Sequence, residues 1–250
     1  AASDVYKRQG YIEDELCGCR FRISPTSFYQ INPVQTEKLY KTAMMLARLN
    51  KRNVVVDAYC GIGTIGMVAA KTVKEVIGVE IVEEAVEAAK ENAKMNGLDN
   101  CRFIAGDVLK MLDEIEEKPD FIVLDPPREG IHPKALPKII EYGVDKMVYI
   151  SCKPTSLARD LEVLIEQGYR VQRVCCVDMF CSTVHVETVV MLSHKKPDSV
   201  INVKVEFGEG EGKVPLDNIA KRAEAYKPKE RVTYKMIKEY IEAKYGFKVH

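Results

Sequence analysis

The stretch Asp57-Ala58-Tyr59-Cys60-Gly61-Ile62-Gly63-Thr64-Ile65-Gly66 decides the fold of this chain. It follows Val54-Val55-Val56, an apolar β-branched run that is typical of a strand buried on both faces, and it leads into the helical pattern of Met67-Val68-Ala69-Ala70. Glycines let the backbone turn tightly and let a ligand approach a helix N-terminus, where backbone N–H groups are free. The sequence therefore predicts a strand, a cofactor-binding turn at Gly61 and Gly63, and a helix.

Two cofactors fit this turn. The spacing Gly61-x-Gly63-x-x-Gly66, with Glu80 at the end of the next predicted strand, matches dinucleotide-binding folds, in which such an acid binds a ribose hydroxyl. S-adenosylmethionine instead carries a sulfonium and an amino group, which a carboxylate attracts, whereas a carboxylate repels phosphate. Asp57 at the strand end therefore favours S-adenosylmethionine. A dinucleotide and a purely structural turn are the remaining interpretations.

Composition narrows the class of protein. A chain of 250 residues can bury one full α/β core with material left over. Lys plus Arg and Asp plus Glu are equal, at 37 each, so no overall positive field indicates a nucleic-acid partner, and a polyanion would need a local patch or another part of the protein. The eight cysteines lack paired zinc spacing. We expect no metal, reduced thiols in the cytoplasm, no membrane association and no protein partner.

Strand and helix patterns alternate along most of the chain and predict a parallel, doubly wound α/β sheet. The last two strands are joined by residues 178–183, a connection so short that the pair must be antiparallel. An antiparallel hairpin at the end of an otherwise parallel seven-stranded sheet is typical of the Rossmann-like class I methyltransferases and departs from the dinucleotide fold. The predicted strands are 53–57, 76–80, 101–105, 120–124, 146–150, 171–177 and 184–192, and the predicted helices are 34–49, 64–71, 83–96, 107–115, 133–142 and 155–167.

Small appendages are expected at both ends of this catalytic domain, which we place at residues 31–193. Residues 1–30 contain a short hairpin pattern and are interpreted as the remnant of a preceding domain. Residues 194–250 are expected to form a charged C-terminal extension. We interpret both appendages as incomplete.

Two further residues follow strand ends and are candidates for chemistry. Asp125 begins Asp125-Pro126-Pro127-Arg128, and we expect it to face the same crevice as the glycine turn, because ligands bind past the carboxyl ends of strands in such sheets. Cys152 precedes a predicted helix, whose dipole would favour a thiolate together with Lys153 and Arg159. A surface turn and a buried inert cysteine are the alternative interpretations.

A nucleophilic cysteine beside a methyl donor points to a particular acceptor. Amines attack a sulfonium methyl directly, and amino-methylating enzymes tend to place an aromatic residue after Pro-Pro, where this chain has Arg128. Carbon C5 of a pyrimidine must first be activated by a thiolate that adds to C6, after which a base removes the C5 proton. Glu187, in the last strand, is either that base or an exposed strand carboxylate. Thiolate and base together predict C5 methylation of a pyrimidine that is turned out of its stack.

Five motifs together resemble the RNA uracil-5-methyltransferase family, from about residue 20 to residue 192. Each motif alone is modest, but five in this order are specific. They are Ser27-Phe28-Tyr29-Gln30-Ile31-Asn32, Asp57-Ala58-Tyr59-Cys60-Gly61-Ile62-Gly63, Asp125-Pro126-Pro127-Arg128-x-Gly130, Ser151-Cys152-Lys153-Pro154-x-x-Leu157-Ala158-Arg159-Asp160 and Asp178-x-Phe180-x-x-Thr183-x-His185-Val186-Glu187.

The resemblance implies a role for each matching residue. Cys152 would be the nucleophile and Glu187 the proton acceptor. The substrate would be RNA, most similar to the 23S rRNA type because of the Tyr-Cys-Gly-x-Gly-Thr form of the loop. Transfer RNA as substrate, RNA cytosine-5 methylation, an NAD-dependent reductase and a catalytically silent RNA-binding module are the alternatives. The residues that would bind S-adenosylmethionine are Gln30, Tyr59, Glu80 and Asp125, beside the turn glycines Gly61 and Gly63.

Overall fold

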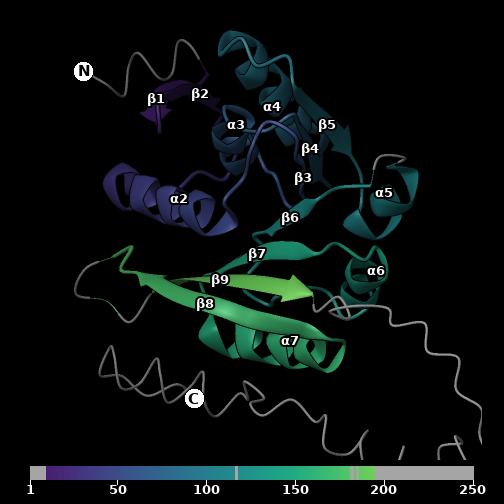
Figure 1. Ribbon diagram of the computed structural model, residues 1–250. Coiled ribbons are helices and arrows are strands. Elements are labelled where there is room, and N and C mark those ends of the chain that lie inside the picture. The colour runs from purple at the N-terminus through teal and green to yellow at the C-terminus, as the bar shows by residue number, and fades with distance from the viewer. Residues whose placement is uncertain (1–9, 116–117, 181–182, 184–185, 195–250) are drawn as a thin grey trace, which may run out of the picture.

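Seven strands form the central sheet of the protein, in the order β5-β4-β3-β6-β7-β9-β8 (Figure 1). The computed structural model describes residues 10–115, 118–180, 183 and 186–194. Within these residues the sheet is the mostly parallel, seven-stranded sheet that the sequence predicts. Its strands are β3 (Val54–Asp57), β4 (Glu75–Glu80), β5 (Cys101–Ala105), β6 (Phe121–Leu124), β7 (Lys146–Ser151), β8 (Tyr169–Val177) and β9 (Glu187–His194).

The two last strands pair antiparallel, and β9 lies between β7 and β8. The antiparallel hairpin is therefore confirmed, but its second strand begins at Glu187 and not at residue 184. The first partners of β9 are Val177, opposite Glu187, and Ser151, opposite Thr188. Strand pairing thus starts only at Glu187, which makes it the first residue of the strand.

Helices bury both faces of the sheet, because side chains alternate between the two faces of a strand. Val55 of β3 packs with α2, α3 and α4 on one face, whereas Val54 and Val56 pack with α5, α6 and α7 on the other (Figure 1). This two-sided burial explains the continuous apolar runs of the parallel strands. The helices are α2 (Pro33–Ala47), α3 (Thr64–Ala70), α4 (Glu83–Met95), α5 (Val108–Glu114), α6 (Ala135–Glu141) and α7 (Pro154–Glu166).

A two-stranded hairpin is formed by β1 (Ile12–Leu16) and β2 (Cys19–Ile23). It packs into the core on the α2, α3 and α4 side of the sheet, and two asparagines of α4 form hydrogen bonds with it. The buried Asn92 accepts a hydrogen bond from the backbone N–H of Arg22 (2.7 Å) and donates one to its carbonyl (3.3 Å). Asn96, one turn later, makes the same pair of bonds with Arg20 (2.8 and 2.6 Å). The two side-chain amides thus satisfy backbone N–H and C=O groups at the edge of β2 that a neighbouring strand would otherwise bond.

Replacing Asn92 by alanine is expected to lower the free energy of unfolding by about 2 kcal/mol, because two backbone hydrogen bonds are lost at a buried site. Urea unfolding measures the change. Lys94→Ala, at an exposed position of the same helix, serves as the control and should change the free energy by less than about 0.5 kcal/mol. Equal stability of the two variants would contradict the proposed fastening role.

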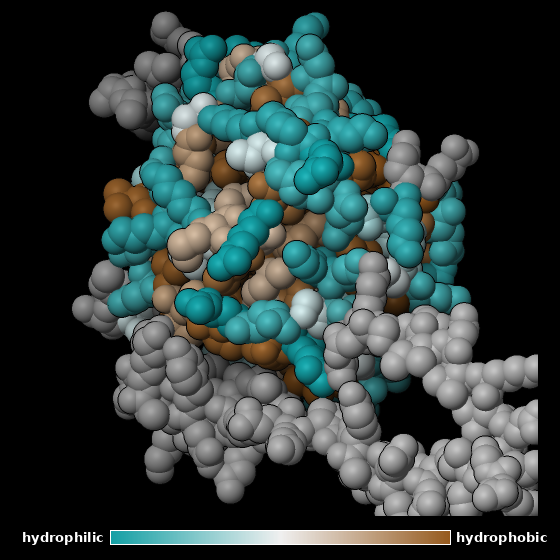
Figure 2. Space-filling view, in the orientation of Figure 1, coloured by the Kyte–Doolittle hydropathy of each residue, from teal (hydrophilic) through white to brown (hydrophobic). Residues whose placement is uncertain are grey.

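The surface carries apolar side chains next to the first helix of the described chain. Phe28, Ile31 and Val34 are exposed by 77, 80 and 65%. On the face shown in Figure 2, hydrophilic residues surround smaller areas of apolar ones.

None of the helices in the described ranges has the length and apolar character needed to cross a membrane. The expected C-terminal extension lies, apart from His194, outside the described residues.

Candidate active site

The predicted site residues gather at one edge of the sheet, where the parallel strands have their carboxyl ends. Asp57, the last residue of β3, is in register with Val123 of β6, so Asp125 lies just beyond the end of the neighbouring strand. Leu124 is in register with Tyr149 of β7, and Cys152 follows the end of that strand. Three neighbouring strands therefore bring Asp57, Asp125 and Cys152 to the same edge of the sheet.

The glycine turn between β3 and α3 has the conformation that the sequence requires. Gly61 and Gly63 have positive φ angles of 53° and 84°, which L side chains rarely adopt. A Cβ atom at Gly63 would lie 2.6 Å from Met67 Cε, whereas a Cβ atom at Gly61 would meet nothing within 4 Å. The positive φ angle thus favours glycine at position 63, where a side chain would also displace Met67 and crowd Phe103, while Gly61 borders open space.

Carboxylates hold this turn in place from two sides. Glu80, at the end of β4, accepts a hydrogen bond from the N–H of Gly61 at 3.0 Å. Asp57 is fully buried and accepts one from the N–H of Gly66 at 3.0 Å. Burial raises the pKa of Asp57 to about 7, against the opposing effect of hydrogen bonds from the backbone of Gly66 and Tyr59. Asp57 therefore shapes the turn in addition to supplying charge near it.

Cys152 and Glu187 lie side by side. Ser151 of β7 and Thr188 of β9 are partners in an antiparallel register. Because the strands run in opposite directions, the residue after Ser151, Cys152, lies beside the residue before Thr188, Glu187. Glu187 is only 7% exposed, and burial raises the pKa of its carboxyl to about 7, partly offset by the positive charge of Arg128. A buried carboxyl with a pKa near neutrality is suited to exchange a proton at physiological pH. The exposed-carboxylate interpretation of Glu187 is wrong.

The charge around the Cys152 thiol differs from the sequence expectation. Burial raises the pKa of this thiol, and the charges of Glu187 and Asp125 raise it further. The group that lowers it is the nearby guanidinium of Arg128, and not Lys153 or Arg159. The expectation that Lys153 and Arg159 favour the thiolate is therefore wrong.

Geometry explains this correction. Arg159 donates hydrogen bonds to the carbonyl of Glu129 (2.6 Å), in the loop after β6, and to the carboxylate of its neighbour in α7, Asp160 (2.8 Å). Arg128 reaches the thiol from the loop after β6. It is the functional residue that the sequence analysis missed as a partner of Cys152. The available signal was a cation placed directly after the stiff Pro126-Pro127 pair.

Two further predicted cofactor residues, Tyr59 and Gln30, are each partly buried. Tyr59 is half-buried in the turn, and burial raises the pKa of its hydroxyl to about 12. Gln30 is half-buried in the extended stretch before α2, and the described residues give its amide no hydrogen bond. Two residues further on, Asn32 donates a hydrogen bond to the carbonyl of Met179 at 2.9 Å, which fastens this stretch to the chain leading into β9. His185 of the last motif lies outside the described residues.

The carboxyl groups at this edge of the sheet suit a positively charged ligand. Burial raises the pKa of Asp125, and the charges of Glu187 and Asp57 raise it further, so these carboxyl groups repel one another. A ligand with a sulfonium and an amino group relieves that repulsion, whereas the pyrophosphate of a dinucleotide would increase it. The open space at Gly61 gives the ligand a place to approach the backbone. Within the described ranges no cluster of three or more His, Cys, Asp or Glu side chains could hold a metal ion.

Comparison with known sequences gives a consistent result. A family model described as tRNA (Uracil-5-)-methyltransferase matches residues 5–195. A relative from Clostridium tetani, named as an uncharacterized RNA methyltransferase, is 51% identical over 74% of this chain and 41% of its own length. A similarly named relative from Caldanaerobacter subterraneus is 49% identical over 76% of this chain and 42% of its own length. The chain thus spans about two fifths of the length of the curated relatives it matches.

Solved structures show the same fold. The tRNA (uracil-54, C5)-methyltransferase of Pyrococcus abyssi, in complex with S-adenosyl-L-homocysteine, superposes with a TM-score of 0.63 and 29% identity, over 74% of this chain and 44% of that one. The tRNA m1G37 methyltransferase of M. jannaschii superposes with a TM-score of 0.57 over 75% of this chain and 57% of that one. At 15% identity the second likeness concerns the fold alone. The predicted class I methyltransferase fold is confirmed.

Proposed function

This chain belongs to the tRNA (uracil-5-)-methyltransferase family, and on that premise we propose that it transfers a methyl group from S-adenosylmethionine to C5 of a uridine in RNA. The observation that carries the proposal is the closeness of Cys152 to Glu187, which follow and precede the paired residues Ser151 of β7 and Thr188 of β9. Methylation at a nitrogen or oxygen atom needs no such thiol. Methylation at C5 of a pyrimidine needs both a nucleophile for C6 and a base for the C5 proton.

Each group has a defined task in this reaction. The Cys152 thiolate forms a bond to C6, and the electron pair of the C5–C6 double bond makes C5 nucleophilic. S-adenosylmethionine, when bound, supplies the electrophilic methyl group. Glu187 then accepts the proton from C5, the double bond reforms, and the sulfur leaves as a thiolate. Arg128 supports the first and the last step, because its contact with the thiol favours the thiolate form.

The cofactor would be held by the residues that border the crevice. Asp125, Glu80, Tyr59 and Gln30 would contact it from four segments of the chain, and the turn of Gly61 and Gly63 would lie against it. The repulsion among the buried carboxyl groups supports this assignment, since a cation is the ligand that lowers it.

Replacing Gly61 by alanine is expected to weaken S-adenosylmethionine binding at least about tenfold, because the new Cβ enters the space beside the cofactor. Isothermal titration calorimetry measures the affinity. Gly97→Ala is a matched control, since Gly97 also has a positive φ (64°) and a Cβ there also meets nothing within 4 Å. Both changes carry a similar backbone cost of about 1 kcal/mol. If the two variants bind equally well, the cofactor does not lie against Gly61.

For the RNA we propose 23S rRNA, on the form of the glycine loop, Tyr59-Cys60-Gly61-Ile62-Gly63-Thr64. Transfer RNA is the second candidate, and the name of the matching family and that of the P. abyssi relative favour it. The full-length protein should be incubated with each purified RNA and labelled S-adenosylmethionine, and the nucleosides identified by mass spectrometry. 5-Methyluridine from ribosomal RNA alone supports the proposal, 5-methyluridine from transfer RNA alone replaces the substrate, and 5-methylcytidine overturns the base assignment.

The division of the chain follows the same proposal. Residues 31–193 would be the catalytic domain of a cytoplasmic enzyme, residues 1–30 the end of a preceding domain, and residues 194–250 a charged extension. The hairpin β1–β2 shares its core with the sheet, so the end of the preceding domain would be built into the catalytic one. Contacts that select the RNA would come from parts of the protein outside the motifs.

A further inference from the structure

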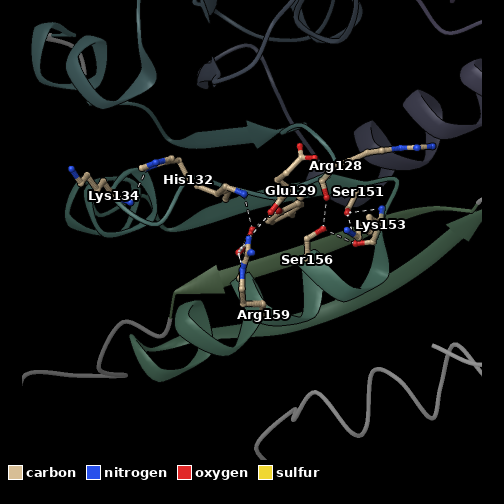
Figure 3. Close-up of polar contacts among 11 residues, drawn as sticks. Arg128, Glu129, His132, Lys134, Ser151, Lys153, Ser156 and Arg159 are labelled. Carbon is tan, nitrogen blue, oxygen red and sulfur yellow. Dashed lines mark hydrogen bonds and ion pairs between the residues drawn. The ribbon is translucent and has the colours of Figure 1, made fainter. Parts of the chain in front are cut away.

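A network of hydrogen bonds that runs from the buried Asp160 to the surface ties the loop after β6 to the first turns of α7 (Figure 3). Ser156 donates a hydrogen bond to the carbonyl of Arg128 at 2.8 Å, and Arg159 donates one to the carbonyl of Glu129 at 2.6 Å. Asp160 accepts one from the N–H of Ile131 at 2.7 Å. Three side chains of one helix thus hold the loop at residues 128, 129 and 131. We call Ser156, Arg159 and Asp160 the α7 clamp.

Asp160 is the centre of the clamp and is 1% exposed. One carboxylate oxygen, Oδ2, also accepts a hydrogen bond from the hydroxyl of Tyr149 on β7 at 2.7 Å, and the other, Oδ1, pairs with the guanidinium of Arg159 at 2.8 and 3.0 Å. A buried carboxylate is tolerated only when its oxygens are fully hydrogen-bonded, and here sheet, loop and helix each provide a donor. The position of the loop relative to α7 is therefore fixed closely.

Gly130 shows how tightly the loop lies against the helix. A Cβ atom at this position would be 2.5 Å from Asp160 Oδ2 and 2.7 Å from Arg159 Nη2, and the φ angle of 83° also favours glycine. The loop can approach the clamp only because this residue has no side chain.

The clamp joins the two parts of the site that must meet. The loop carries Arg128, whose side chain extends away from α7 (Figure 3) and whose positive charge lowers the pKa of the Cys152 thiol. Cys152 itself lies two residues before the start of α7, and the hydroxyl of Ser156, whose one hydrogen is shared between two carbonyls, also lies 3.1 Å from the carbonyl of Lys153. The same helix turn therefore holds the backbone on both sides of the contact between Arg128 and Cys152.

We propose that Asp160, acting with Arg159 and Ser156, is a positioning residue that holds Arg128 against the Cys152 thiol. This inference rests on the proposed function, because it takes Cys152 as the nucleophile. None of the three clamp side chains needs to touch the substrate. The groups that act on the thiol itself are Arg128, Glu187 and Asp125, and the clamp sets the distance of the one cation among them.

Asp160→Asn tests the clamp with a nearly isosteric change. An asparagine amide offers one acceptor where the carboxylate offers two, so it loses either the Arg159 pair or the bonds to Ile131 and Tyr149. The reaction of Cys152 with iodoacetamide is followed against pH, by mass spectrometry of the peptide that contains Cys152. We expect the alkylation rate at pH 7.5 to fall about 3- to 10-fold, because the midpoint of thiol ionisation moves up by about 0.5 to 1 pH unit.

A double variant separates positioning from general stability. Arg128→Ala should lower the alkylation rate by at least as much as Asp160→Asn, and Arg128→Ala/Asp160→Asn should lower it no further, because the clamp acts only through Arg128. A purely structural role of Asp160 would instead give effects that multiply. Multiplying effects, or a wild-type alkylation profile in Asp160→Asn, overturn the proposal.

Two further variants keep the test decisive. Ser156→Ala removes only a hydroxyl, is expected to shift the profile in the same direction by a smaller amount, and decides the question if Asp160→Asn does not fold. Glu162→Gln, at an exposed position of the same helix, should leave the profile unchanged. The alkylation assay needs neither RNA nor cofactor. A shifted profile in a protein that forms no 5-methyluridine would therefore uphold the clamp and reject only the proposed reaction.

Discussion

Replacement of Cys152 by alanine is expected to reduce uridine methylation by at least about 10³-fold, because C5 of the ring is not activated without a thiolate on C6. Cofactor binding should remain, since Cys152 is not among the residues proposed to hold the cofactor. With RNA that contains 5-fluorouridine, the wild-type protein should form a covalent complex that survives denaturation, because fluorine at C5 cannot be removed as a proton. Gel electrophoresis and intact-mass measurement detect this complex, and Cys152→Ala should not form it.

The matched control for this variant is Cys101→Ala. Cys101 is also a half-buried cysteine, but it begins β5 at the opposite edge of the sheet from the site. The control should form the covalent complex at the wild-type rate. A complex that persists in Cys152→Ala would show that another residue is the nucleophile, and the pairing of Cys152 with Glu187 would then lose its proposed meaning.

The Glu187→Gln variant is expected to separate the two halves of the reaction. Attack by Cys152 and methyl transfer need no carboxylate, whereas removal of the C5 proton does. We therefore expect methylated RNA to stay covalently bound to the protein, and release to slow by about 10²- to 10⁴-fold, the range for loss of a general base. Single-turnover experiments with labelled methyl groups measure bound and released product separately.

The pH dependence gives this variant a second readout. The pKa of Glu187 is raised to about 7, so the wild-type carboxyl keeps its proton up to neutral pH and serves as a base only above it. Product release by the wild-type protein should thus slow as the pH falls below about 7, and this limb should vanish in Glu187→Gln. A normal rate of release in the variant would remove Glu187 from the mechanism and leave the cysteine assignment intact.

The fold follows from local patterns that act over a few residues. Val54-Val55-Val56 must be a buried strand because both faces of it are apolar, and Gly61 and Gly63 must form a turn because their positive φ angles exclude most residues. Because these constraints involve residues that are neighbours in the sequence, the order of the elements and the antiparallel end of the sheet could be predicted. The start of β9 could not, since it depends on where its partners Ser151 and Val177 stop.

The site was predictable in its members but not in all its contacts. Cys152 and Asp125 could be placed together because each follows the carboxyl end of a parallel strand, and these ends share one edge of the sheet. Glu187 was expected inside a strand, and only the resemblance to the family suggested its role. The direction of a long cationic side chain is decided by tertiary packing. Arg159 is close to Cys152 in sequence but is drawn to Glu129 and Asp160, while Arg128 arrives from a distant loop. Proximity in the sequence therefore led to Arg159 as the cation beside Cys152, whereas the structure places Arg128 there.

The position of β9 between β7 and β8 links catalysis to the completion of the sheet. Neighbouring residues of a strand point to opposite faces, so a slip of one residue between β7 and β9 would put Thr188 where Glu187 belongs. On the proposed roles, a growing chain that ends before β9 would carry the nucleophile Cys152 and the glycine turn but would lack the base Glu187. Insertion of β9 between β7 and β8 would therefore be the step that completes the proposed site.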